Sequence, residues 1–248
     1  MTTGFTNVLA VESKLFWRDR GSSFFGLFFP AVLLLALGFF FPGFGDPNED
    51  LGGMRPIDIY VPVVLVAGVA AVALTVFPVS LSTYRQDGVL RRLATTPLPP
   101  SRLLLAHLTV QVVVALTGGV LGVAAAMALL DVPAPGSWIG FGAMFLLATV
   151  SIFSIGLLIG SVAPTTSSGQ GFGLLAFFPT MFFAGVYFPR EAMPEGLRTV
   201  SDFTPAGSAV QAMRDTWDGV APALPNLLVV IGFTVVAVAL AVRLFRWE

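Results

Sequence analysis

The sequence has no cysteine, one histidine and very few charged residues. Only 11% of its 248 residues are charged, against about 25% in a typical soluble domain, and 56% are hydrophobic. The lack of cysteine excludes disulfides, thiolate metal ligands, iron–sulfur clusters and cysteine nucleophiles. The 14 acidic and 13 basic residues nearly cancel, so no basic field exists for nucleic acid. So little charge cannot cover a water-facing surface, and the sequence predicts an integral membrane protein.

The hydrophobic residues are gathered in long continuous runs. A helix needs about 20 apolar residues to cross about 30 Å of hydrocarbon, and only helices or a closed barrel satisfy the backbone there. Barrel strands alternate every second residue, whereas these runs do not, so we expect an all-α fold. We predict six membrane-spanning helices in a single domain over 22–248, at 22–41, 57–83, 103–130, 138–162, 170–188 and 224–245.

The distribution of basic residues predicts the orientation of these helices. Six crossings put both termini on one side of the membrane, together with the loops 84–102 and 163–169. Nine of the 13 basic residues fall on that side and four on the other. The positive-inside rule places the richer side in the cytoplasm. We therefore expect a multi-pass protein of a prokaryotic cell membrane with both termini cytoplasmic.

The N-terminal segment 1–21 has its own pattern. Apolar residues recur at helical spacing, among them Phe5, Leu9 and Phe16, while Glu12 and Lys14 lie largely off that stripe. This indicates an amphipathic helix that lies in the cytoplasmic interface. The alternative is a solvated leader that only supplies orientation charges.

The loop 85–97 between the second and third expected spans has the pattern of a short helix, and we call it the docking loop. One face would be apolar and the other basic, and prolines end the helix before the next span. A passive charged linker is the alternative, but a passive linker needs neither an apolar ridge nor a proline stop. We interpret the loop as a docking element for another protein, formed by Asp87, Gly88, Val89, Leu90, Arg91, Arg92, Leu93, Thr96 and Pro97.

The stretch 189–220 between the fifth and sixth expected spans is the outer segment. Prolines break it, and 197–203 and 206–217 can each form a helical piece. Short helices that dip back into the outer leaflet and a simple folded loop are both compatible with this pattern.

Several kinds of chemistry have no residues to support them. There is no G-x-x-x-x-G-K-[ST] motif for ATP binding. Ionisable residues inside spans mark ion and proton pathways, and here only Asp58 and His107 lie near span ends. We interpret His107 as a packing residue rather than a proton shuttle. Inverted halves typical of secondary transporters are not visible, so we expect something other than this chain to supply the energy.

Glycine and phenylalanine are the abundant small and large residues of the spans. The pairs Gly118–Gly122 and Gly156–Gly160 have the G-x-x-x-G spacing that allows helices to approach closely. The glycines of 169–173 are interpreted in the same way rather than as a dinucleotide loop. Most of the 23 phenylalanines are expected to face lipid or neighbouring helices.

Two motifs give the chain a family resemblance. The docking loop contains a G-x-L-x-R-L-x-x-T-P core over 88–97. An aromatic–proline pair stands at the start of the outer segment, and a second proline and a short helix ending in arginine follow. The residues of this outer motif are Phe188, Pro189, Glu191, Pro194, Pro205 and Arg214. Over essentially its whole length the chain resembles the permease subunit of ABC type-2 exporters, particularly the daunorubicin-resistance branch. It departs from the family pattern at Arg91, where members often carry an acid.

The resemblance implies a transporter subunit that is not itself an enzyme. It would move a hydrophobic or amphiphilic substrate, such as a drug, lipid or glycolipid, out of the cytoplasm or inner leaflet. ATP and magnesium would be bound by two copies of a separate cytoplasmic ATPase subunit, which the docking loop, as the coupling helix, would contact. This chain would have no catalytic or metal site, and its other contacts would be with membrane lipid.

The resemblance also implies a second permease, either an identical chain or a sister. The second and fifth spans would meet at the two-fold axis, which makes Thr75, Phe77, Phe178 and Phe182 candidates for the substrate pathway. Two alternatives remain. One is an ABC permease that exports polysaccharide or a lipid-linked glycan, and the other is a secondary carrier or scaffold outside the ABC class.

Overall fold

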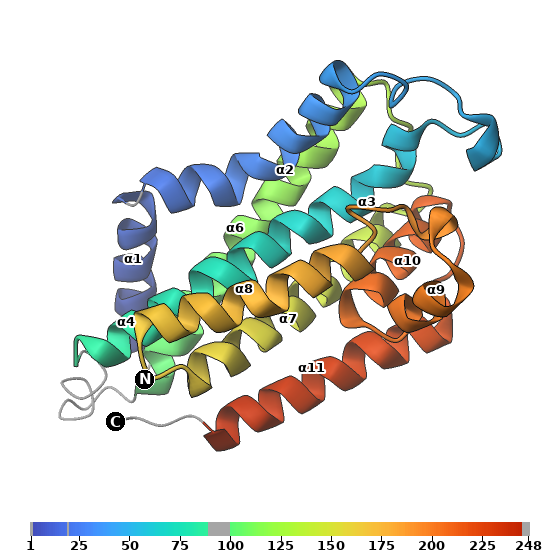
Figure 1. Cartoon of the computed structure of the whole chain (residues 1–248). Helices are drawn as coiled ribbons and strands as arrows, with labels where there is room; N and C mark the ends of the chain where they lie inside the picture. The colour runs from blue at the N-terminus through green and yellow to red at the C-terminus, as the bar shows by residue number, and fades with distance from the viewer. Residues whose placement is uncertain (1, 19, 89–99, 245–248) are drawn as a thin grey trace.

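The computed structural model describes residues 2–18, 20–88 and 100–244, and the regular secondary structure of this part of the chain is all helical, without strands. The expected all-α class is therefore confirmed. Most of the helices run along a common direction, and α1 stands at an angle at one end (Figure 1). The elements are α1 (Thr2–Arg18), α2 (Arg20–Phe40), η1 (Glu49–Leu51), α3 (Pro56–Ala70), η2 (Ala71–Val76), α4 (Phe77–Gln86), α6 (Pro100–Leu129), α7 (Trp138–Val162), α8 (Thr166–Phe183), η3 (Arg190–Ala192), α9 (Glu195–Asp202), α10 (Pro205–Trp217) and α11 (Leu224–Leu244).

Five helical stretches of the described chain are long and apolar enough to cross a membrane: 23–40, 56–86, 104–129, 138–162 and 224–244. They correspond to five of the six expected spans. The expected span 170–188 is not among them, so the count of six is not confirmed. Its helix, α8, starts earlier with a polar turn from Thr166 to Ser168 and ends at Phe183. The chain then turns at Gly185, whose φ of +90° glycine adopts readily.

The second expected span is the central rod of the molecule. It consists of α3, the π-helix η2 and α4, which continue into one another over 56–86, and most of its residues are buried. Pro78 explains the π-helix, because proline has no N–H and its ring clashes with the carbonyl four residues before it. The N–H of Phe77 accordingly donates to Val72, five residues back. The carbonyls of Ala73 and Leu74 thus lose their usual α-helical donors.

Two glycines on neighbouring helices lie against these carbonyls. A Cβ atom at Gly156 of α7 would overlap the carbonyl oxygen of Ala73, and one at Gly173 of α8 would overlap that of Leu74. The geometry permits Cα–H···O contacts, which partly compensate a carbonyl without an N–H donor. Glycine therefore lets α7 and α8 pack directly on the π-helix.

The other glycine contacts confirm the expected close approach of helices. Gly118 lies against the backbone of α2, where a Cβ would be 2.5 Å from the carbonyl oxygen of Gly26, and Gly122 lies against Pro30. On α7, Gly160 packs on Leu81 of α4. Both G-x-x-x-G pairs are thus helix contacts, and the small residues bring the backbones together.

The N-terminal segment forms the expected helix, α1. Its inner face packs on α6, where Phe16 joins Leu27, Val110 and Val114 in a small apolar cluster. The other side of α1 exposes large apolar side chains, including Trp17. Contrary to the expectation from the apolar stripe, Glu12 lies on the buried face, with 4% of its surface exposed.

The outer segment folds into η3, α9 and α10, and α10 packs against α7 and α11. Thr204 caps α10 by accepting a hydrogen bond from the N–H of Gly207 at 3.1 Å, and Pro205 occupies the first turn. The apolar face of α10 is buried and contains Val210 and Met213. The helices α9 and α10 overlap the two expected pieces, 197–203 and 206–217, and α10 packs into the bundle.

Candidate functional site

The docking loop begins where α4 ends. Asp87 follows the last residue of α4, and Gly88 has a φ of +68°, the left-handed conformation that suits glycine. The rest of the predicted docking element, from Val89 to Pro97, lies outside the described residues. Its expected helix and contacts therefore stay predictions.

The last turn of α4 is attached to the turn between α7 and α8. The guanidinium of Arg85 donates to the carbonyls of Ala163 and Ser161, the latter at 3.2 Å, at the end of α7. Positive charge at a helix C-terminus is favourable because the last carbonyls lack partners. Gln86 Oε1 accepts from the N–H of Thr166 at 3.2 Å and from its hydroxyl at 3.0 Å. The last turn of α4 is therefore fastened to the end of α7 and to the start of α8.

A buried polar cluster joins α1, α4 and α6 near the same end; it consists of Glu12, Tyr84 and His107 and is called the Glu12 cluster. His107 Nδ1 lies 2.7 Å from Glu12 Oε2. The hydroxyl of Tyr84 donates to the two carboxylate oxygens of Glu12 at 3.2 and 3.3 Å. The His107 ring also stacks on Phe77, with 5.3 Å between ring centroids.

The Glu12 cluster corrects part of the sequence interpretation. Glu12 was expected off the buried stripe, and no buried acid was expected beside the spans. The sequence did contain a signal, because Leu9, Glu12 and Phe16 share one helical face at spacings of three and four residues. The stacking of His107 on Phe77 agrees with the packing role expected for it, and its hydrogen bond with Glu12 is an addition.

The four pathway candidates are not brought together on one surface. Phe77 is fully buried and also packs edge-on against Phe153 of α7. Phe178, by contrast, is 56% exposed on α8. Thr75 and Phe182 are partly buried, and the hydroxyl of Thr75 donates to the carbonyl of Ala71 within the π-helix. In this conformation only Phe178 has a largely exposed side chain.

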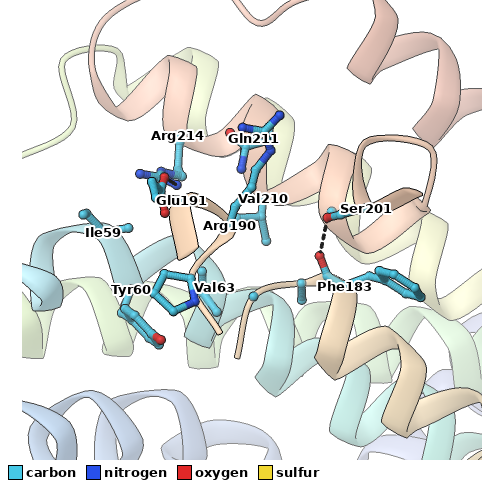
Figure 2. A pocket seen from close by; sticks show the side chains of 14 residues that line it. Ile59, Tyr60, Val63, Phe183, Arg190, Glu191, Ser201, Val210, Gln211 and Arg214 are labelled. Carbon is cyan, nitrogen blue, oxygen red and sulfur yellow. Dashed lines mark hydrogen bonds and ion pairs between the residues drawn. The ribbon is translucent and has the colours of Figure 1, made fainter. Parts of the chain in front are cut away.

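At the opposite end, the outer segment is held by ion pairs, and Figure 2 shows the side chains of Arg214 and Glu191 next to each other. Arg214 of α10 donates to Glu191 at 2.6 Å, so two residues of the predicted outer motif are joined. Arg190 makes a two-pronged contact with Asp202, at 2.8 and 2.6 Å. The hydrogen bond and charge of Asp202 raise the pKa of Arg190 above its ordinary value, although burial acts in the opposite direction. The guanidinium therefore stays charged at any physiological pH.

The geometry of the outer motif indicates a structural role. The space between its side chains is about 10 Å³, which accommodates no more than one water molecule. Figure 2 shows the hydroxyl of Ser201 donating to the carbonyl of Phe183 at the end of α8, at 2.7 Å. Pro189, Pro194 and Pro205 each stand at the start of a short helix, and Phe188 is exposed.

Arg55, directly before α3, forms an ion pair with Asp58 and donates hydrogen bonds to backbone carbonyls just after α6. Arg55 Nη2 lies 2.7 Å from Asp58 and 2.8 Å from the carbonyl of Asp131. The hydrogen bond and charge of Asp58 raise the pKa of Arg55, with burial opposing them. Asp58, which the sequence placed near a span end, thus fixes an arginine rather than marking an ion pathway.

Taken together, the long apolar helices define a multi-pass membrane protein, in which the last turn of α4 is hydrogen-bonded to the end of α7 and to the start of α8. The family model of the ABC-2 type transporters matches residues 3–217. The chain belongs to this family, and the resemblance drawn from its motifs is confirmed. The match runs from α1 to the last residue of α10 and so includes both motifs.

One curated relative is similar over most of the chain. It is the daunorubicin resistance ABC transporter permease protein DrrB1 of Streptomyces coeruleorubidus. The two sequences are 29% identical over 229 residues, an alignment that covers 88% of this chain and 77% of the relative.

Two features of the site were missed by the sequence interpretation. The sequence interpretation treats Arg85 only as an orientation charge. In the structure its guanidinium donates hydrogen bonds to two carbonyls that lie 76 and 78 positions further along the chain. Glu12 contacts a histidine 95 positions away. Periodicity reports which face of one helix is buried, and it contains no information about which distant helix covers that face.

Proposed function

We propose that this chain is the membrane-spanning permease subunit of an ATP-driven exporter. Its cargo is hydrophobic or amphiphilic, such as a drug, lipid or glycolipid, and moves out of the cytoplasm or inner leaflet. A separate cytoplasmic subunit, present in two copies, binds ATP and magnesium and hydrolyses the ATP. The family match over 3–217 is the observation that carries this proposal.

The connection at the end of α4 supports a coupling mechanism. Closure of the ATPase pair would push on the docking loop and on α1. Arg85 and Gln86 would pass that displacement to the α7–α8 turn through the hydrogen bonds described above. Because α7 and α8 both pack on the π-helix, the central rod would move with them.

A pair of permeases supplies the pathway in this proposal. On α8, a row of large apolar side chains is exposed, namely Phe172, Leu174, Leu175 and Phe178. The first turn of α8 is polar, so contact with lipid would be unfavourable there. If α8 packs beside a second permease instead, it can cross the membrane as the sixth span. Figure 1 places the start of α1, the end of α4 and the end of α11 at the same end of the bundle, which agrees with two cytoplasmic termini.

Affinity purification from the native membrane tests the subunit assignment. The tagged chain is expected to bring down a cytoplasmic ATPase in a fixed ratio. Changing Leu90, Arg92 and Leu93 to Ser should remove the ATPase, because these changes abolish the apolar ridge and a basic residue of the docking loop. Leu197→Ser with Val220→Ser, at exposed positions of the outer segment, is the matched control. A chain that purifies alone under conditions that preserve other membrane complexes would contradict the proposal.

The lack of cysteine makes a clean test of the permease pair possible. A single Leu175→Cys on the exposed face of α8 should form a disulfide-linked or bis-maleimide-linked product that contains two permease chains. Leu228→Cys, also well exposed but on α11, is the control and should not form it. Equal cross-linking at both positions would argue against α8 as the face between permeases.

A further inference from the structure

The two ends of the central rod face the same neighbours only because the π-helix lies between them. Leu65 of α3 faces α6, where a Cβ at Gly122 would be 3.2 Å from it. Phe77, at the start of α4, also faces α6 and stacks on His107. Leu65 and Phe77 are twelve positions apart, which in an α-helix leaves them about 120° apart around the axis. The π-helix holds one extra residue, which turns α4 back by about 100° and brings both onto one face.

A second pair gives the same result on another side of the rod. Val63 of α3 lies 4.0 Å from the position of a Cβ at Gly185, in the turn after α8. Ser82 of α4 lies against Gly169 of α8. Nineteen positions separate Val63 from Ser82, and an α-helix would leave them about 100° apart. One extra residue again accounts for the difference, so the rod packs as a straight α-helix with one residue fewer would pack.

The extra residue is therefore not needed to orient the rod, and it interrupts the hydrogen bonds of the helix. The carbonyls of Ala73 and Leu74 lose their α-helical N–H donors in the middle of the 56–86 span, where no water is present to replace those donors. A helix bends most sharply where its hydrogen-bond ladder is interrupted, and π-turns are frequent at functional sites. The π-helix is thus the point at which the rod bends most easily.

The contacts around the π-helix permit a bend there. Gly156 and Gly160 of α7 face the rod, and so do Gly169 and Gly173 of α8. Glycines present backbone rather than interlocking side chains, so α7 and α8 can tilt against the rod at these points. The far end of α4 is fastened to the ends of α7 and α8, whereas α3 packs most extensively on α2. The two halves of the rod therefore have different main partners, and Figure 1 shows them extending towards opposite ends of the bundle.

We propose that the π-helix is the bending joint of the central rod. Around it, α4 and the adjoining ends of α7 and α8 tilt together relative to α3, so a push on the docking loop reaches the middle of the span as a change of angle. The extra residue supplies this joint without changing which helices the two ends of the rod face. The proposal deepens the proposed function and rests on it only for the force that drives the bend.

A rod without the joint tests this. Deletion of Ala73 combined with Pro78→Ala should make the rod an uninterrupted α-helix whose two ends keep their partners, and we call this the straight-rod variant. The hydroxyl oxygens of Thr83 on α4 and Thr166 on α8 are 3.2 Å apart, so a Thr83→Cys, Thr166→Cys pair reports the rotation of α4 by forming a disulfide. The disulfide should form in the straight-rod variant as in the parent chain. A folded variant that does not form it would refute the register, and the joint with it.

Transport is measured as the ATP-dependent uptake of rhodamine 6G, a hydrophobic dye, into inside-out membrane vesicles. The straight-rod variant should lose transport while the ATPase still co-purifies. Pro78→Ala alone is the matched control, because it keeps the residue count and the packing of both ends still requires the extra residue; it should retain the disulfide and transport. Transport by the straight-rod variant at the level of this control would overturn the joint. Equal loss in both variants would assign the effect to the proline and overturn it as well.

Hydrogen exchange of the unaltered chain in lipid nanodiscs tests the joint even if the straight-rod variant does not fold. The amides of 74–77 should exchange faster than those of 80–83, an α-helical stretch with the same mixture of buried and half-buried residues. The second stretch lies nearer the end of the span, so its position alone would favour faster exchange. Protection of 74–77 equal to or greater than that of 80–83 would overturn the proposal.

The two proposals fail separately. A chain that purifies with an ATPase and transports the dye equally well with a straight rod would lose the joint alone. A chain that purifies without an ATPase would lose the subunit assignment, while the disulfide and exchange measurements still decide the joint.

Discussion

Packing of α7 on the π-helix leads to a sharp stability prediction at Gly156. In Gly156→Ala, the new Cβ would overlap the carbonyl oxygen of Ala73, lie 3.0 Å from its carbonyl carbon, and lie 3.5 Å from a ring carbon of Phe77. The obstacle is the carbonyl group of Ala73, which cannot yield easily because it is backbone, whereas the Phe77 ring lies at an ordinary contact distance. The helices must therefore separate locally.

Three contributions set the expected change in the free energy of unfolding of Gly156→Ala. Overpacking a dense interface costs about 1–3 kcal/mol, and the rigid backbone obstacle favours the upper end of that range. Loss of the Cα–H···O contact adds about 0.5–1 kcal/mol, whereas alanine gains about 1 kcal/mol over glycine in helix propensity. We expect a net loss of about 2–3 kcal/mol in the free energy of unfolding.

Gly142→Ala is the matched control, because it lies on the same helix and no atom lies within 4 Å of its added Cβ. It should be neutral or stabilise by up to about 1 kcal/mol. Reversible unfolding by SDS in mixed micelles, followed by the fluorescence of the four tryptophans, measures both variants. If Gly156→Ala proves as stable as Gly142→Ala, the proposed direct contact of α7 with the π-helix is refuted.

Three further predictions concern the two polar ends. Gln86→Leu removes the acceptor for Thr166, so cargo efflux should fall several-fold while the ATPase still co-purifies; unchanged efflux would exclude this coupling route. Asp202→Asn leaves Arg190 without its charged partner and, since both side chains are about one-third exposed, should cost only about 1–2 kcal/mol by SDS unfolding; no loss would contradict it. Thr204→Ala should lose about 1 kcal/mol as α10 loses its cap, and Thr204→Ser should retain it; equal stability of the two would count against the cap.

The sequence alone was sufficient for the class of protein and for most of the helices. Apolar runs that exceed the thickness of a bilayer leave few alternatives to membrane helices, and the expected span 138–162 coincides with α7. The glycine pairs also predicted helix contacts correctly, because a missing side chain is useful only where another backbone approaches. The motifs at the two ends predicted the family.

Sequence reasoning was weaker where a segment mixes signals. The expected span 170–188 combined the apolar half of α8 with the turn that follows it, whereas the helix itself begins at Thr166 and includes a polar turn. Hydropathy averages over the apolar half of the helix and the turn after it, so it placed both the start and the end of this span too late in the chain. The capping box of Thr165 with Ser168 is the local signal that marks the true start.

Only the tertiary structure decided which residues work together. Glu12 and His107 are 95 positions apart, and Arg85 and Ala163 are 78 apart. Local patterns determine helices because backbone hydrogen bonds and side-chain periodicity act within a few residues. Contacts between helices depend on how the faces of the whole bundle fit. The class and family of this protein were therefore present in its sequence, whereas the buried carboxylate, the anchored end of α4 and the π-helix inside the central rod appeared only when the chain was folded.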